Sequence, residues 1–144
     1  MITFKQMDSP QEWSWFKSRT SVIYCEDTVG IVAMRDDDIA AMCVFDSFSP
    51  FSCNVHLAID DTAAIRAGLF TQVALYAYVT RGCERIFGLV PSNNAKALKL
   101  DKHIGFTEVS RVPRALGKDV DYIVMCLERE DCRWLPEEFR EEAA

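Results

Sequence analysis

The fold of this chain is decided by residues 84–106, which read ERIFGLVPSNNAKALKLDKHIGF. Residues 85–90 are a short apolar run bounded by turn residues, which is typical of a buried strand. A residue from Ser92 to Asn94 can cap the amphipathic helix that follows, and Gly105 can end that helix. The stretch therefore predicts a strand, a helix and a second strand in succession.

The order of residues along this predicted helix resembles a known motif. Asn94 is followed by Ala97 and Leu100, and the helix closes with Gly105-Phe106. This pattern resembles the second conserved motif of the GCN5-related N-acetyltransferases, the GNAT superfamily, and the resemblance covers most of the chain. The likeness is greatest to a group found in phages and prophages, whose members also end in a sequence like residues 132–135, Cys-Arg-Trp-Leu. It implies an α+β (α/β/α) sandwich in which helices flank a mixed, mostly antiparallel sheet.

Composition limits the class of protein. A chain of 144 residues fits one domain, residues 1–144, and can bury a core without disulfides or a metal. No apolar run approaches the roughly 20 residues that a membrane helix needs, and the N-terminus lacks the pattern of a signal peptide. We therefore expect a cytoplasmic protein. The six scattered cysteines are expected to be buried thiols, and the net charge of −6 argues against general binding of nucleic acid or anionic membranes.

The first half of the chain predicts a strand, a helix and a hairpin. Residues 2–6 alternate as a strand does, and Ser9-Pro10 can open a helix. The apolar runs 28–35 and 39–45 predict two strands joined by a turn at the three aspartates between them, and we interpret this triplet as a solvated turn, not a metal site. In GNAT enzymes the acceptor groove lies beside the first helices, so Trp13 or Trp15 either lines a substrate pocket or belongs to the core.

Residues 52–80 predict the next strand and a long helix. Strand alternation over residues 52–59 places Leu57 and Ile59 on one face and His56 on the other. A helical pattern then runs from Ala63 to about Thr80. A turn that enters a helix offers uncommitted N–H groups and the positive end of the helix dipole to an anion.

The resemblance implies that this strand and turn bind acetyl-CoA as co-substrate. In the family the strand splays from its neighbour to bind the pantetheine arm, and the turn wraps the pyrophosphate. Here the turn departs from the usual Gln/Arg-x-x-Gly-x-Gly/Ala, because it has one glycine at a short spacing from Arg66, our choice for the phosphate contact. The expected cofactor-binding residues are Leu57, Ile59, Asp60, Arg66, Ala67, Gly68, Leu69, Asn94 and Ala97.

The last strands are expected at residues 105–111 and 121–127, with a basic loop from Arg111 to Asp119 between them. In the family the two strands pair beside the acceptor site, so Arg111 and Arg114 either contact an acidic group of the acceptor or are solvated. The charged tail, residues 137–142, is expected to be a peripheral helix or frayed.

Direct acetyl transfer needs a base, a polarised thioester carbonyl and a proton for the departing thiolate. His56 is the candidate base, because histidine titrates near neutral pH, and a backbone N–H at Ile59 or Asp60 could polarise the carbonyl. Many family members have a tyrosine where this chain has Asp101, whose carboxyl could donate a proton only if burial raised its pKa. Tyr122, Tyr76, Tyr78 or solvent are the alternatives, which gives His56, Asp101 and Tyr122 as the catalytic candidates.

Two functions remain open on the sequence. In the first, the chain is an N-acetyltransferase that acts on an amine of a protein or small molecule. In the second, it is a catalytically weak or inactive binding or inhibitory protein of phage origin that keeps the fold. We favour the enzyme, with acetyl-CoA and an unknown amine acceptor as partners and with a homodimer as a possible assembly.

Overall fold

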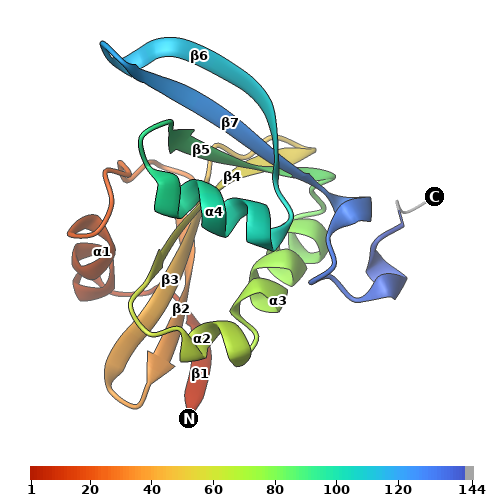
Figure 1. The fold of residues 1–144 in the computed structure, drawn as a ribbon. Coiled ribbons are helices and arrows are strands. Elements are labelled where there is room, and N and C mark those ends of the chain that lie inside the picture. Colours follow the sequence, from red (N-terminus) through yellow and green to blue (C-terminus); the bar gives the residue numbers. More distant parts are fainter. Residues whose placement is uncertain (142–144) are drawn as a thin grey trace.

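A computed structural model describes residues 1–141 and shows one seven-stranded sheet (Figure 1). The strand order is β1-β2-β3-β4-β5-β7-β6, and every neighbouring pair is antiparallel except β4 and β5. This confirms the predicted mixed, mostly antiparallel sheet. The strands are β1 (Ile2–Gln6), β2 (Val29–Arg35), β3 (Asp38–Asp46), β4 (Ser52–Ile59), β5 (Arg85–Pro91), β6 (Thr107–Gly117) and β7 (Val120–Glu128).

The helices follow local capping signals. Ser9 caps α1 (Pro10–Lys17) through a capping box with Glu12, and the Oδ1 atom of Asn94 caps α4 (Ala95–Ile104) by accepting from the N–H of Ala97. The others are α2 (Ala63–Arg66), α3 (Leu69–Ala74), the π-helix η1 (Leu75–Thr80) and the 3₁₀ turns η2 (Arg129–Asp131) and η3 (Glu137–Phe139). Within residues 1–141, each helix is too short or too polar to cross a membrane.

The prediction of one continuous helix from Ala63 to Thr80 was wrong. Gly68 has a φ of 109°, a left-handed conformation that ends α2 and starts α3 in a new direction. Glycine adopts this conformation without steric cost, whereas a helix interior cannot contain it. The apolar spacing continues across the break because α2 and α3 both pack on the sheet.

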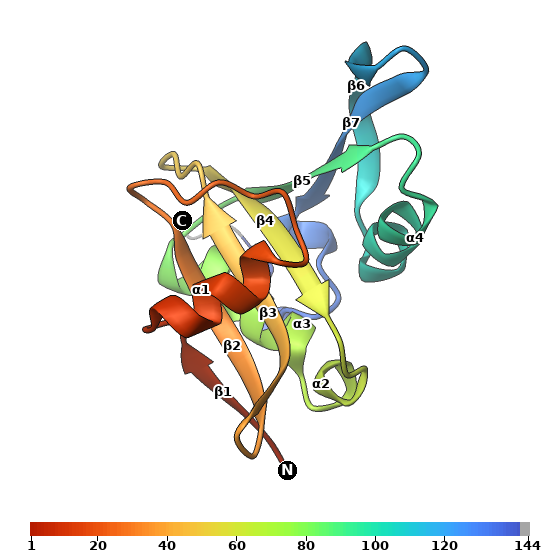
Figure 2. The same ribbon diagram turned by 90° about the vertical axis from the view of Figure 1, so that its left-hand side faces the viewer.

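The two faces of the sheet are covered by different helices, as Figure 2 shows. On one face Phe16 of α1 packs against Val32, Met42 and Val44. The larger core lies on the other face, where Leu69 and Val73 of α3 are buried with residues of β3, β5 and β7. The sheet is therefore closed on both sides near β2 and β3.

The predicted basic loop from Arg111 to Asp119 is largely strand. β6 extends to Gly117 and turns through two residues into β7, so the pair forms a long hairpin that projects from the body (Figure 2). Pro113 is tolerated because β6 is an edge strand and the register with β7 shifts between Val112 and Gly117. Arg111 binds Glu108 and Asp121 of this hairpin. The tail prediction is tested only in part, because η3 is a short 3₁₀ turn and Glu142 lies outside the described residues.

β4 and β5 pair over only three residues before they separate. The paired positions run from Ser52 opposite Arg85 to Asn54 opposite Phe87, while the remaining five residues of β4 pair only with β3. Figure 2 shows the two strands turning away from each other, with α4 beyond the gap. The sheet thus has an opening at its centre, as the resemblance implied.

Candidate active site

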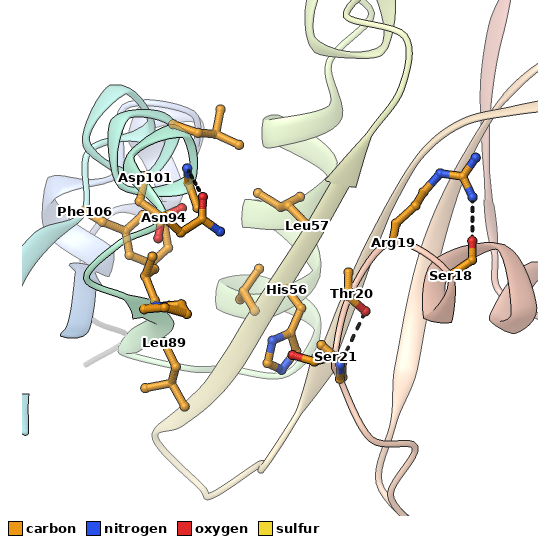
Figure 3. A pocket seen from close by; sticks show the side chains of 17 residues that line it. Ser18, Arg19, Thr20, Ser21, His56, Leu57, Leu89, Asn94, Asp101 and Phe106 are labelled. Atoms are coloured by element: carbon orange, nitrogen blue, oxygen red, sulfur yellow. Dashed lines mark hydrogen bonds between the residues drawn. The ribbon is translucent and has the colours of Figure 1, made fainter. Parts of the chain in front are cut away.

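A cavity of about 520 Å³ lies in the opening between β4 and β5 (Figure 3). β4 contributes Val55, His56 and Leu57, and β5 contributes its last residues. The opposite wall comes from α4, and the segment after α1 closes the side. The other lining residues are Ser18, Arg19, Thr20, Ser21, Val22, Gly88, Leu89, Val90, Pro91, Asn94, Ala97, Leu100, Asp101 and Phe106.

A second cavity, of about 540 Å³, adjoins the first and is bordered by the β6–β7 hairpin; we call it the hairpin cavity. Five residues line both cavities, and His56 and Leu89 are among them. Tyr122 lines only the hairpin cavity, whereas Asp101 lines only the first. His56 therefore lies between the two cavities, with Asp101 in the first cavity and Tyr122 in the hairpin cavity.

His56 is held by a buried carboxylate. Its Nε2 atom lies 3.0 Å from Oδ2 of Asp46, the last residue of β3, which is only 6% exposed. Because a carboxylate only accepts, Nε2 carries the proton of this hydrogen bond and Nδ1 is left as the basic nitrogen. The pair can take a proton from a neighbouring group and stabilise the resulting imidazolium.

Asp101 is a partly desolvated acid. It points from α4 toward β5, and its Oδ2 atom would lie 2.7 Å from a Cβ placed on Gly88. Within residues 1–141 no basic side chain forms an ion pair with it, and burial raises the pKa of the Asp101 carboxyl to about 6. The Asp101 carboxyl therefore keeps its proton to a higher pH than an exposed aspartate does.

The prediction that the amide of Asp60, in the turn after β4, is free was wrong. The N–H groups of Asp60 and Asp61 both donate to the carbonyl of Ala40, at 3.0 and 2.9 Å. The next helix start is also occupied, because Ala63 N donates to Oδ1 of Asp61. Asp60 therefore cannot polarise a carbonyl with its amide, since β3 already satisfies that group.

Both carboxylates of this turn are neutralised by arginines. Arg19 binds Asp60 through two nitrogens, and Arg35 binds Asp61 at 2.7 Å. These hydrogen bonds hold the pKa of each aspartate below its ordinary value. Arg19 thereby joins the segment after α1 to the end of β4, along the wall of the first cavity.

Further amide donors lie at the α2–α3 corner. The first N–H groups of α3 have no partner inside the helix, and a Cβ added to Gly68 would meet nothing within 4 Å. Arg66, at the end of α2, is exposed and forms no ion pair within residues 1–141. Ala67 is also exposed, whereas the side chain of Leu69 is fully buried in the core.

The predicted residues on the strand and on α4 fall into two groups. Leu57, Asn94 and Ala97 line the first cavity, although the Asn94 side chain also serves as the helix cap. Ile59 pairs with Ala41 at the end of β4 and does not line the cavity.

The alternative tyrosines lie elsewhere. The hydroxyl of Tyr78 donates to the carbonyl of Leu127 at 2.5 Å, and burial raises the pKa of Tyr78 well above its ordinary value. Tyr76 lines a different cavity, beside β1 and β2. Neither side chain is therefore placed to serve the gap between β4 and β5.

Sequence reasoning missed Asp46 and Gly88. The strand predicted over residues 39–45 stops one residue short of Asp46, which ends β3 opposite Asn54, two positions from His56 on the neighbouring strand. The antiparallel register places such residues on the same face, so this pairing was available once β3 and β4 were aligned. Nothing in the sequence indicated that Gly88 matters, because its role is to leave room for the side chain of Asp101, which lies on another element.

Comparisons with known proteins bear on the fold. No protein-family model and no curated protein matches this sequence. Among solved structures, a GNAT-family protein from Desulfovibrio desulfuricans has a TM-score of 0.71 at 15% identity, covering 89% of this chain and 99% of that one. The spermidine/spermine N-acetyltransferase SpeG from Vibrio cholerae has a TM-score of 0.71 at 13% identity, covering 88% and 92%.

A third similar structure is the ribosomal-protein-S18-alanine N-acetyltransferase from Escherichia coli, with a TM-score of 0.63 at 16% identity, covering 89% of this chain and 94% of that one. All three structures superpose on most of this chain. At identities this low the likeness concerns the architecture. The chain has the fold of the GNAT N-acetyltransferases.

Proposed function

We propose that this chain transfers an acetyl group from acetyl-CoA to an amine by direct attack. The observation that carries the proposal is the opening between β4 and β5, where a cavity holds Asp101 on one side and meets the hairpin cavity at His56. A base and an acid thus border one continuous space. That arrangement is what a direct acyl transfer from a thioester to an amine requires.

The residues present fit acetyl-CoA in part. The unpaired inner edges of β4 and β5 suit an extended pantetheine arm, with Leu57, Asn94 and Ala97 along its path. The α2–α3 corner, with Gly68, the first amides of α3 and Arg66, suits the pyrophosphate in place of the closed turn at Asp60. When bound, acetyl-CoA supplies an activated acyl group.

His56 serves as the base in this proposal, and Asp46 as its positioning residue. Nδ1 of His56 takes the proton of the acceptor ammonium, and Asp46 stabilises the imidazolium that forms. The freed amine nitrogen then forms a bond to the acyl carbon as the carbon–sulfur bond breaks. The sulfur keeps the electron pair of the broken bond, and the nitrogen releases its extra proton to solvent as the amide forms.

Asp101 provides the proton for the departing sulfur. Its carboxyl lies across the first cavity from β4, and its raised pKa of about 6 leaves a usable fraction protonated near neutral pH. A thiolate forming nearby raises that fraction further, because like charges disfavour the ionised carboxyl. Asp101 thus takes the place of the tyrosine found in many GNAT enzymes.

The first test is ligand binding. A ligand present at 100 times its Kd stabilises a protein by about 2.7 kcal/mol, which is a shift of several degrees in melting temperature for a chain of this size. We expect this shift with acetyl-CoA and not with a nucleotide of matched charge that lacks the pantetheine arm. Equal shifts with both, or none with either, would contradict the proposal.

The second test compares the two histidines of the chain. His56→Gln is expected to lower kcat/KM for CoA release at least about 100-fold, the usual contribution of a general base. His103→Gln is the matched control, because His103 is exposed at the end of α4 and should leave the rate unchanged. Asp101→Asn should lower kcat with little effect on the acceptor KM.

A catalytically weak binding protein is the second candidate, favoured by the closed turn at Asp60. The amides and carboxylates of that turn are occupied by Ala40, Arg19 and Arg35, which leaves fewer groups for a diphosphate. If acetyl-CoA stabilises the chain but no amine causes the release of CoA, this second function is favoured. Phage origin, a cytoplasmic location and a homodimer stay predictions from the sequence.

A further inference from the structure

The hairpin cavity differs from the first cavity in its composition. Among the described residues, its walls carry no group other than Asp46 and His56 that is charged in its ordinary state at neutral pH. Asp46 is almost fully buried, and the carboxylate is already hydrogen-bonded to His56. The cavity therefore offers a single negative charge, and that charge serves the base.

The remaining walls are uncharged, and a little over half of their residues are apolar. Val22 and Ile23 come from the segment after α1, Leu89 from β5, and Leu116 and Val120 from the hairpin. Leu116 and Ile23 are large exposed apolar side chains, at 48% and 71%. Exposed apolar residues that face a shared cavity are typical of a site that buries an apolar partner.

The elements around the hairpin cavity place no further acidic side chains in its walls. The hairpin carries three basic side chains, Arg111, Arg114 and Lys118, against four acidic ones, Glu108, Asp119, Asp121 and Glu128. Glu128 forms an ion pair with Arg85 and does not line the cavity. The segment after α1 carries Glu26 and Asp27, but neither lines the cavity, and Asp27 accepts from the amide of Phe48. The net charge of −6 is thus not concentrated at this cavity.

We infer that the acceptor is a primary amine with one positive charge on an uncharged, largely apolar body, and that polyamines are poor acceptors. This inference rests on the proposed function. The ammonium group of a monoamine gives one proton to His56, and Asp46 balances the positive charge that His56 then carries. The apolar body of the amine covers Leu89 and Leu116. A polyamine would place further ammonium groups against neutral walls that hold no free carboxylate, and burying a charge without a paired carboxylate is costly.

The test measures CoA release from acetyl-CoA with three acceptors. They are phenethylamine, a short peptide with an alanine N-terminus and apolar residues after it, and spermidine. We expect kcat/KM for at least one of the first two to exceed that for spermidine by more than tenfold, within the range that pocket complementarity gives. The first two acceptors distinguish a small molecule from a polypeptide as the source of the amine. A kcat/KM for spermidine as high as those for the other two acceptors would overturn the inference.

A variant with a new carboxylate in the cavity sharpens this test. Leu116→Asp should lower kcat/KM for the apolar monoamine about tenfold and raise it for spermidine. Val112→Asp is the matched control, because Val112 is a similarly exposed residue of β6, at 50%, that does not line the cavity. Equal changes in both variants would show that charge on the hairpin, not in the cavity, sets the preference.

Failure of the proposed function can be told apart from failure of the inference. If acetyl-CoA does not stabilise the chain and no amine releases CoA, the proposed function is overturned and the inference with it. If acetyl-CoA stabilises the chain and spermidine is the preferred acceptor, only the inference is overturned. Preference for a monoamine together with the Leu116→Asp switch supports both.

Discussion

At the scale of single residues, the partly buried carboxyl group of Asp101 links the stability of the chain to the proposed activity. The group sits against Gly88 in the first cavity, and burial raises its pKa from 3.8 to about 6. The desolvation that raises this pKa disfavours the ionised form of Asp101 in the folded chain. A residue of this kind costs stability where it is ionised, which is common at sites that perform chemistry.

Asp101→Asn should raise stability at pH 8 and lower activity. Because the folded pKa lies above the unfolded one, the folded chain holds this proton more tightly, and stability falls as pH rises from about 4 to about 6. The difference between the two pKa values corresponds to a loss of stability of at most about 3 kcal/mol. This loss is complete above about pH 6. Urea denaturation of both proteins at pH 4 and pH 8 measures it. An identical pH dependence in the variant would mean that Asp101 is not responsible.

At the scale of elements, β5 and α4 approach closely because Gly88 has no side chain. Asp101 projects from α4 to this point, and Leu100 and Ala97 on the same helix line the cavity beside it. The divergence of β4 from β5 opens the sheet, while the approach of α4 to β5 fixes what faces the opening. The width of the cavity and the position of the acid are thus set by the same contact.

Gly88→Ala is expected to disturb this contact. The new Cβ would lie 2.7 Å from Oδ2 of Asp101, so the carboxyl or the helix must move, at a cost of about 1 to 3 kcal/mol. The double variant Gly88→Ala with Asp101→Ala removes the atom that clashes and should recover most of that loss. Free energies of unfolding for the two single variants and the double variant form the cycle. Strict additivity would contradict the proposed contact.

At the scale of the whole molecule, the segment after β7 fastens α3 to α4. The indole N–H of Trp134 donates to the carbonyl of Ile104 at 2.8 Å, and its ring lies 5.1 Å from that of Phe70 in an edge-on arrangement. Cys132 and Leu135 on either side are buried in the main core. This segment closes the narrow end of the opening between β4 and β5, with the wider cavity left beyond it.

Trp134→Phe should destabilise the chain by about 1 kcal/mol, because the carbonyl of Ile104 loses its indole donor while most of the ring contact with Phe70 is kept. Trp15→Phe is a suitable control, since the Trp15 indole N–H donates to no group within residues 1–141. Chemical denaturation of the two variants measures the difference. An equal loss of unfolding free energy in both variants would show that the Trp134 hydrogen bond makes no particular contribution to stability.

The sequence by itself determined the order of strands and helices and the limits of α4, because these depend on local periodicity and on short-range caps. Asn94 bonds to a residue three positions away, and Gly105 ends the helix with a φ of 123°. Even the error at Gly68 was local, since the glycine was noted but its left-handed conformation was not.

Only the tertiary structure decided the chemistry of the opening. Asp46 meets His56 because β3 and β4 are neighbours in a particular register, and Asp101 gains its raised pKa because α4 packs on Gly88. The turn after β4 is closed because the carbonyl of Ala40 lies within reach of two amides. Each of these contacts joins residues from different elements, and hydrogen bonding and desolvation depend on distances that local sequence patterns do not contain.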